Sequence, residues 1–162
     1  MATWMICNFG NKSTVNTLGK ILTSGKALAS YCLTEPNAGS DASSIQTKAI
    51  RHGSTYKING GKIFASGAGE TDILVVMAKT EKTQSSGISA FVIDAKSKGI
   101  SYGRKEKKMG WNSQPTRTIS FDNVEVPADN LLGNEGDGFK IAMQGLDGGR
   151  INIAACSIVA AQ

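Results

Sequence analysis

The sequence Tyr-Cys-Leu-Thr-Glu-Pro-Asn-Ala-Gly-Ser-Asp occupies residues 31–41 and leads from a candidate strand at 28–34 into a loop. The loop is rich in turn-forming residues, and it offers free backbone amides and two hydroxyls. Such a loop can hydrogen-bond the edge of a planar heteroaromatic ring and an amide-rich tail. A purely structural alternative exists, in which Ser40 or Asp41 caps a short helical turn.

A second informative stretch, Asn-Gly-Gly-Lys-Ile-Phe-Ala-Ser-Gly-Ala-Gly, occupies residues 59–69. Asn59-Gly60 predicts a tight hairpin turn, because a type I′ turn needs two residues with positive φ. Residues 62–66 then form the return strand, with Phe64 and Ser66 on one face. An aromatic ring and a hydroxyl on one face can pack against and hydrogen-bond a ring system. The alternative is an ordinary core strand.

The chain between residues 28 and 127 shows strand patterns throughout. Apolar residues alternate with polar ones at 45–49, at 56–58 and again at 118–126, and 51–54 reads as a turn. Residues 73–78 are continuously apolar, which is typical of a strand buried on both faces, and 88–93 forms another strand. Short strands at this spacing predict a mainly β fold with flanking helices, built as a barrel or a sandwich.

Both ends of the chain have helical periodicity. Residues 1–27 are expected to be helical, with one apolar face made by Val15, Leu18, Ile21 and Leu22. From about Gly136 the helical period returns, and one stripe contains Phe139, Met143, Leu146, Ile153 and Ala160. The pattern continues to Gln162 without a stop signal, which we read as a sign of truncation.

A third stretch, Asp147-Gly148-Gly149-Arg150, lies inside this last helix. Two glycines in a helix cost roughly 1 kcal/mol each relative to alanine, so a ligand that approaches the backbone closely would explain them. Arg150 falls on the apolar stripe, where a charge needs a partner or a ligand. The equally weighted alternative is a simple pair between Asp147 and Arg150, three residues apart.

Composition and missing motifs narrow the function. The 162 residues carry a net charge of +5, but the basic residues form no single run with interleaved aromatics, so nucleic-acid binding is not favoured. An anionic small ligand accounts for the charge equally well. The sequence has no phosphate-binding GxxxxGK[ST] loop, no GxGxxG and no GxSxG, and its single histidine, His52, lies in a predicted turn. Histidine-based triads and metal sites are therefore disfavoured, and no apolar run has transmembrane length.

Together, the three stretches resemble the acyl-CoA dehydrogenase family. Residues 31–41 match its Y-x-x-T-E-P-x-x-G-S-D signature at every defined position, and residues 59–66 resemble the N-G-x-K-x-[WF]-I-[ST] strand, with Ala65 replacing isoleucine. Met109-Gly110-Trp111 and 121–127 agree in order. Residues 105–117 and 148–154 look most like the isobutyryl-CoA dehydrogenase branch.

The resemblance implies a domain plan and a set of site residues. Residues 1–27 would end an N-terminal helical domain, 28–135 would form the middle β-barrel that binds flavin and acyl-CoA, and 136–162 would begin a C-terminal helical bundle. FAD would be the cofactor. The residues implied at the flavin are Tyr31, Leu33, Thr34, Phe64 and Ser66, and those implied at the CoA substrate are Ser40, Asp147 and Arg150.

The resemblance also implies a reaction. A carboxylate removes the α-proton of an acyl-CoA while a hydride leaves the β-carbon for the flavin. The family's usual glutamate base is expected beyond Gln162, and Gly149 occupies the position where some members place it. The parent protein would be a homotetramer in the mitochondrial matrix that passes electrons to electron-transfer flavoprotein; without mitochondrial import it would be cytoplasmic. The isolated chain is expected to be inactive, and the competing hypothesis is a non-catalytic flavin- or CoA-binding or assembly module.

Overall fold

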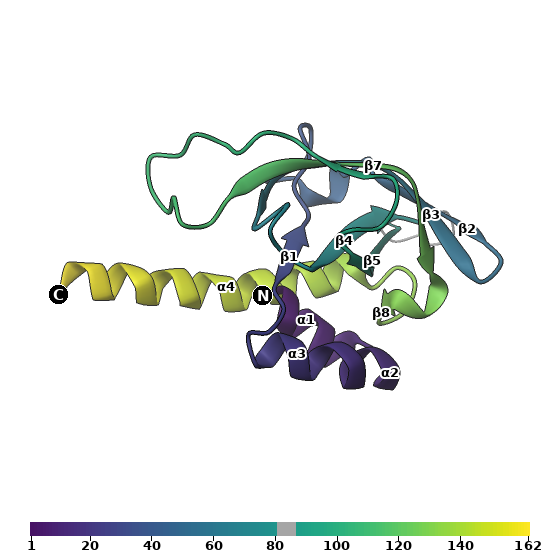
Figure 1. Ribbon diagram of the computed structural model, residues 1–162, viewed down its shortest axis with the longest axis horizontal. Helices are drawn as coiled ribbons and strands as arrows, with labels where there is room; N and C mark the ends of the chain where they lie inside the picture. The colour runs from purple at the N-terminus through teal and green to yellow at the C-terminus, as the bar shows by residue number, and fades with distance from the viewer. Residues whose placement is uncertain (81–86) are drawn as a thin grey trace.

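The computed structural model describes residues 1–80 and 87–162. A strongly curved β-sheet lies against a group of short N-terminal helices and one long C-terminal helix (Figure 1). The N-terminal helices are α1 (Ala2–Phe9), α2 (Lys12–Thr14), η1 (Val15–Gly19, a π-helical turn) and α3 (Lys20–Thr23), and the C-terminal helix is α4 (Gly138–Ala161). Residues 2–9 and 12–23 are helical, which agrees with most of the prediction for residues 1–27, but Ile21 of the expected apolar face is 38% exposed.

The described strands form one eight-stranded sheet. Its hydrogen-bonded order is β6-β7-β3-β2-β4-β5-β8, and β1 pairs with β4 in parallel at the side. The strands are β1 (Ala29–Cys32), β2 (Lys48–His52), β3 (Thr55–Ser66), β4 (Ile73–Lys79), β5 (Ile88–Asp94), β6 (Ile100–Tyr102), β7 (Thr116–Pro127) and β8 (Leu131–Leu132). Two 3-10 turns, η2 (Ala42–Ser44) and η3 (Ala128–Asn130), lie in the connections. The mainly β architecture with flanking helices agrees with the prediction.

Two apolar cores explain why β4 is apolar at nearly every position. Leu74, Val76 and Ala78 point into a core enclosed by the curved sheet, together with Tyr56, Ile58, Phe91, Ile119, Val124 and other buried side chains. Ile73, Val75 and Met77 point to the opposite face, where they pack with β5 side chains against α1, α3 and α4. Side chains alternate across a strand, so a strand covered on both sides must be apolar throughout.

The predicted hairpin turn at Asn59-Gly60 is wrong. β3 continues through both residues, and the turn that reverses the chain lies between β2 and β3, where Gly53 has φ 61°. The pairing of β3 with β7 shifts register between Ile58 and Gly60, which marks a β-bulge. Gly60 has φ 143°, and a Cβ there would lie 2.7 Å from the Thr47 Cα. The Asn-Gly pair therefore serves a bulge and a close approach to Thr47, not a turn.

The predicted apolar stripe of the last helix is only partly correct. Phe139, Met143 and Leu146 do pack against the helix-side core, but the fully buried positions of α4 include Ile141, Ala142 and Gly145. Beyond Arg150 every residue of α4 is exposed, Ile153 and Ala160 included. The helix leaves the rest of the molecule at that point and projects away from it (Figure 1).

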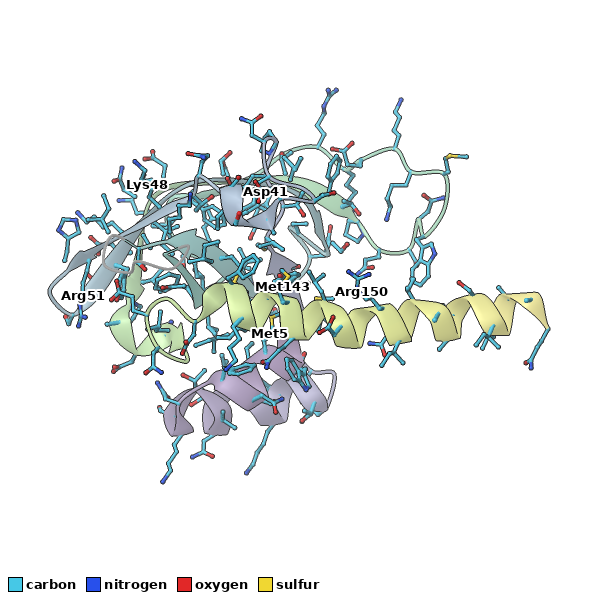
Figure 2. The ribbon with its side chains drawn as sticks, turned by 180° about the vertical axis from the view of Figure 1, so that it is seen from behind. Met5, Asp41, Lys48, Arg51, Met143 and Arg150 are labelled. Atoms are coloured by element: carbon cyan, nitrogen blue, oxygen red, sulfur yellow. The ribbon has the colours of Figure 1, made fainter. Side chains whose placement is uncertain are left out.

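Close packing between α1 and α4 fixes the start of the chain. A Cβ on Gly145 would collide with the end of the Met5 side chain, which lies directly against the helix backbone there. Figure 2 shows Met5 on α1 beneath the part of α4 that carries Met143. Through this contact the first residues of the chain reach the pocket described below. Among the described residues, no helix is both long enough and apolar enough to span a membrane.

Candidate active site

Two segments that are far apart in sequence line one pocket of about 360 Å³. One comprises the end of β1 and the residues after it, and the other is the end of β3. All five residues implied at the flavin lie on this pocket, namely Tyr31, Leu33, Thr34, Phe64 and Ser66. The remaining lining residues are Met1, Ala2, Ala29, Ile63, Gln114 and Leu146. The structure thus brings the first two sequence motifs together at one site.

A second β-bulge determines how β3 lines this pocket. The pairing of β3 with β7 shifts register between Lys62 and Ala65, and Phe64 has φ 54°. This left-handed conformation is uncommon for a bulky residue and costs about 1–3 kcal/mol. Phe64 is 60% exposed, Ser66 is exposed, and Ala65 between them is buried. The two predicted contact residues therefore do face the same side, but through a bulge instead of a regular strand.

Backbone hydrogen bonding joins the two lining segments. The amide of Ile63 donates to the carbonyl oxygen of Thr34 at 2.8 Å. The chain after Thr34 is then closed into a tight loop, because the amides and carbonyls of Glu35 and Ala38 bond to each other reciprocally at 3.1 Å. Thr34 is consequently held at the rim of the pocket from both sides.

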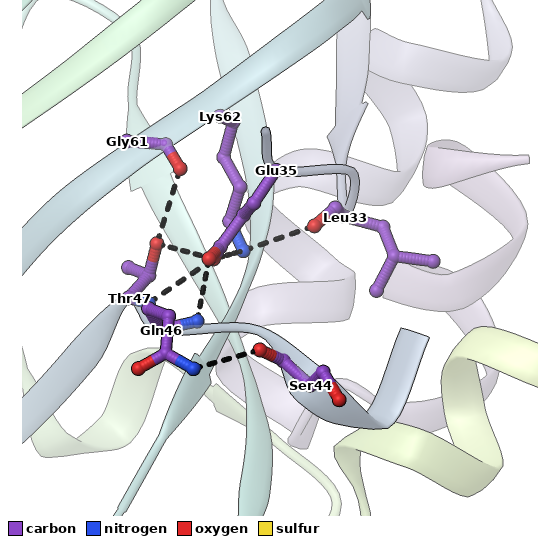
Figure 3. A network of polar contacts seen from close by, with 7 residues as sticks. All are labelled: Leu33, Glu35, Ser44, Gln46, Thr47, Gly61 and Lys62. Carbon is purple, nitrogen blue, oxygen red and sulfur yellow. Dashed lines mark hydrogen bonds and ion pairs between the residues drawn. The ribbon is translucent and has the colours of Figure 1, made fainter. Parts of the chain in front are cut away.

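A buried ion pair joins the two residues next to Thr34 and Ile63 of the pocket lining, and Figure 3 shows its contacts. Lys62 Nζ is 2.6 Å from Glu35 Oε1, and the two side chains are 0% and 4% exposed. The same ammonium donates to the carbonyl oxygen of Leu33 at 3.1 Å. Glu35 also accepts hydrogen bonds from the Thr47 hydroxyl at 2.6 Å and from the amides of Gln46 and Thr47. No motif analysis of the sequence singled out this cluster, although Glu35 and Lys62 both stand inside the quoted stretches.

The charge state of the pair follows from these contacts. Burial raises the pKa of Glu35, but the hydrogen bonds from Lys62, Thr47 and Gln46 outweigh it and hold the pKa below its usual value. Glu35 is therefore a carboxylate at neutral pH. It neutralises an ammonium that would otherwise be isolated in the apolar interior.

One lining residue carries an unused hydrogen-bonding group. The hydroxyl of Tyr31 is buried, and it has no hydrogen-bond partner among the described residues. Burial raises the pKa of this phenol far above its usual value, so it stays protonated. A buried donor without a partner costs about 1–3 kcal/mol.

The three residues implied at the CoA arm lie away from the pocket lining. Ser40 is exposed in the loop before η2, and the neighbouring Asp41 caps η2 by accepting from the amide of Ser43. The structural alternative for this loop therefore holds for Asp41. Asp147 and Arg150 are both exposed on α4, and they form no ion pair with each other in the part of the chain described. The simple pairing considered from the sequence is thus not seen, and Figure 2 shows Arg150 where α4 leaves the body of the molecule.

A second pocket of about 410 Å³ adjoins the first, because Met1 lines both. It is formed by the N-terminal end of the chain and by α4, including Gly148, Gly149 and Asn152. A Cβ on Gly148 would meet nothing within 4 Å, so packing inside the chain does not require glycine there. The feature of the sequence that indicated a binding surface here was the Gly148-Gly149 pair.

The middle-domain model of acyl-CoA dehydrogenases matches residues 30–124 of the chain. The chain belongs to the acyl-CoA dehydrogenase family. It is 50% identical over 161 residues to the mitochondrial isobutyryl-CoA dehydrogenase of Bos taurus, covering 99% of this chain and 39% of that protein. The chain therefore spans about two fifths of the length of this relative.

Solved structures agree with the family assignment. The butyryl-CoA dehydrogenase of Megasphaera elsdenii superposes with a TM-score of 0.89 at 44% identity, covering 94% of this chain and 40% of that one. An acyl-CoA dehydrogenase of Bacillus anthracis in complex with FAD gives a TM-score of 0.80 at 35% identity, covering 87% of this chain and 24% of that one. The curved sheet is the middle domain of this family of oxidoreductases.

Among the described residues, none that lines the pocket between β1 and β3 carries a carboxylate. Glu35 is held behind it by the buried ion pair, and Glu135 is occupied elsewhere, since its carboxylate accepts a hydrogen bond from the Tyr56 hydroxyl at 3.1 Å. The pocket described here thus offers an aromatic face and hydroxyls, but no group able to remove a proton from carbon.

Proposed function

We propose that this chain forms the flavin-binding half-site of an acyl-CoA dehydrogenase. The observation that carries the proposal is the pocket between β1 and β3, on which all five residues implied at the flavin converge. When bound, FAD supplies the hydride acceptor of the dehydrogenation. The 50% identity to an isobutyryl-CoA dehydrogenase supports a short branched acyl-CoA as substrate of the whole protein.

The residues present fit a flavin ring. Phe64 exposes an aromatic side chain to the pocket, and Ser66 adds a hydroxyl beside it. Thr34 lies on the opposite segment, and its hydroxyl would bond the pyrimidine edge of the ring. Tyr31 adds a buried hydroxyl that has no hydrogen-bond partner among the described residues. An apolar ring with a polar edge suits this combination.

The CoA arm would run from the loop at Ser40 to α4, where Asp147 and Arg150 are free to bind it. Arg150 is a strong candidate for contact with a phosphate or an adenine, because a guanidinium combines charge, directed donors and a flat stacking surface. Gly148 leaves the helix backbone open next to these two side chains, since a Cβ there would meet nothing within 4 Å. The net charge of +5 favours an anionic ligand in general.

We further propose that the 162-residue chain alone does not turn over acyl-CoA, since none of the described residues that line the pocket carries a carboxylate. In the whole protein a glutamate from elsewhere would supply the base, in a homotetramer that reduces electron-transfer flavoprotein. A mitochondrial matrix location is proposed from the relative in Bos taurus. The second candidate, a binding module that holds flavin or CoA without dehydrogenation, is favoured by the same missing carboxylate.

The test is flavin retention on a sizing column after incubation with FAD, followed by addition of isobutyryl-CoA. We expect flavin absorbance in the protein peak and no substrate-dependent bleaching. Phe64→Ala should lower retention, whereas Leu28→Ala is the control, because Leu28 is exposed to a similar extent, 58% against 60%, but does not line the pocket. A folded chain that retains no flavin would refute the half-site, and bleaching by substrate would refute the predicted inactivity.

A further inference from the structure

The buried pair Glu35–Lys62 touches both segments that line the pocket, yet neither side chain lines the pocket itself. Lys62 immediately precedes Ile63 and Phe64 on β3, and Glu35 immediately follows Thr34. Their contact therefore crosses from one wall of the pocket to the other. The 2.8 Å hydrogen bond between the Ile63 amide and the Thr34 carbonyl runs beside it.

The pair is poorly explained by stability. Moving two charges out of water costs several kcal/mol per ion, and their attraction offsets this only in part. Two well-packed aliphatic side chains would stabilise the same site at least as well. An aliphatic pair cannot, however, hold the Leu33 carbonyl oxygen and the amides of Gln46 and Thr47 at the same time, as this cluster does.

Those three backbone groups are the ones that fix the course of the chain at the pocket. The Leu33 carbonyl lies where the chain leaves β1. Residues 46 and 47 connect η2 to β2, and Thr47 lies next to the bulge at Gly60. Because Lys62 is itself the residue before the second bulge, the ammonium links the position of Thr34 to that of Phe64. All of these bonds are charge-assisted, which makes them shorter and stronger than neutral ones.

We infer that Glu35 and Lys62 are positioning residues for the flavin, acting as a clamp that sets the separation and orientation of Thr34 and Phe64. The inference rests on the proposed flavin half-site. Neither residue touches the flavin in this scheme. Their effect is exerted through the Leu33–Thr34 backbone on one side and through the β3 bulge on the other.

The double variant Glu35→Gln/Lys62→Met tests the clamp without leaving a buried unpaired charge. The single variant Lys62→Met does leave one and is the variant more prone to unfold. Lys57→Met is the matched control, because Lys57 lies on the same strand and its pair with Glu125 is exposed at 3.8 Å. Near-equal unfolding midpoints of the double variant and the control would show that the fold is retained.

Two readouts separate positioning from a merely structural role. In the flavin-free chain, hydrogen exchange of the Ile63, Gln46 and Thr47 amides should become up to about tenfold faster in the double variant, as expected for loss of one hydrogen bond's stabilisation. Amides that pair β4 with β5 should not change. The FAD dissociation constant, measured by flavin fluorescence, should rise by roughly tenfold, at the lower end of what outer-shell partners contribute elsewhere.

The outcomes distinguish this inference from the proposed function. If the unsubstituted chain binds no FAD, the proposed half-site fails, and the clamp is judged on hydrogen exchange alone. If the chain binds FAD and the double variant binds it equally well, only the positioning role is overturned. Unchanged exchange at Ile63 in a folded double variant would overturn the clamp irrespective of flavin binding.

Discussion

Replacing Gly60 by alanine should destabilise the fold by about 2–6 kcal/mol. Gly60 has φ 143°, in a region that costs a residue with a Cβ about 1–3 kcal/mol. The added Cβ would also lie 2.7 Å from the Thr47 Cα and 2.9 Å from its Cβ, where carbon atoms prefer 3.5–4.0 Å, roughly. Relieving that overlap requires the backbone of residue 47 to move, and overpacking of this kind costs typically about 1–3 kcal/mol.

Two other glycines separate strain from collision. Gly53 also has positive φ, 61°, but a Cβ there meets nothing within 4 Å, so Gly53→Ala should cost only about 1–2 kcal/mol. Gly39 has neither a positive φ nor a neighbour within 4 Å, so Gly39→Ala should stay within about 0.5 kcal/mol of the unsubstituted chain. The difference between the variants at 60 and 53 isolates the collision with Thr47.

Urea unfolding followed by circular dichroism measures all three variants. The midpoint should fall most for Gly60→Ala, with an unchanged dependence on denaturant. Since domains of this size are stable by only about 5–15 kcal/mol, the variant at 60 should lose a substantial part of its stability. A loss at Gly60 no greater than that at Gly53 would refute the interpretation of Asn59-Gly60 as a bulge made for close approach.

Three further predictions concern the site. Gly148→Ala should raise the free energy of unfolding by about 1 kcal/mol, because a Cβ at this helical position meets no neighbour. The same variant should weaken CoA binding if the ligand approaches the backbone there. Urea midpoints measure the first effect, and calorimetric titration with CoA measures the second. Arg150→Gln should leave the urea midpoint within about 0.5 kcal/mol and weaken CoA binding, and unchanged affinity would exclude Arg150 from the arm. The lowered pKa of Glu35 gives stability that is present above its ordinary value of 4.5 and is lost as the pH falls through the folded-state pKa. Urea midpoints of Glu35→Gln should therefore decline less steeply with acid than those of the unsubstituted chain, and parallel curves would contradict the lowered pKa.

Much of the fold followed from alternation and apolar runs. Residues 73–78 could be assigned to a strand buried on both faces, because every side chain of that segment is apolar. The helical ends were also predictable. The bulge at Asn59-Gly60 was not predictable. A glycine with positive φ suits a tight turn and a bulge equally well, and only the position of Thr47 distinguishes them. Local preference correctly predicted a positive φ at Gly60 but not at Asn59, and it misjudged the structure that the Gly60 conformation serves.

The candidate site shows a similar division. Motif resemblance named Tyr31, Leu33, Thr34, Phe64 and Ser66, and the structure places all five on one pocket. Periodicity was only partly right on α4, because its buried positions also include Ile141, Ala142 and Gly145, where α4 packs close to Met5 of α1. Arg150 was assigned to an apolar stripe for this reason, whereas the helix has already left the core there.

The buried pair shows why the sequence alone could not reveal the support of the site. Glu35 and Lys62 are 27 residues apart in the sequence. Taken alone, Glu35 looks like an ordinary acidic residue of a loop, and Lys62 looks like an ordinary lysine of a strand. Their pairing depends on β1 and β3 lying close enough for Lys62 to reach the Leu33 carbonyl, which in turn depends on the bulges of β3. The glycine at 60 lets Thr47 approach, and Thr47 completes the shell of donors around Glu35. The bulges of β3 and the buried Glu35–Lys62 pair thus form one arrangement. A substitution that loosens the bulge should therefore shift the flavin-facing residues, even though none of those residues is itself substituted.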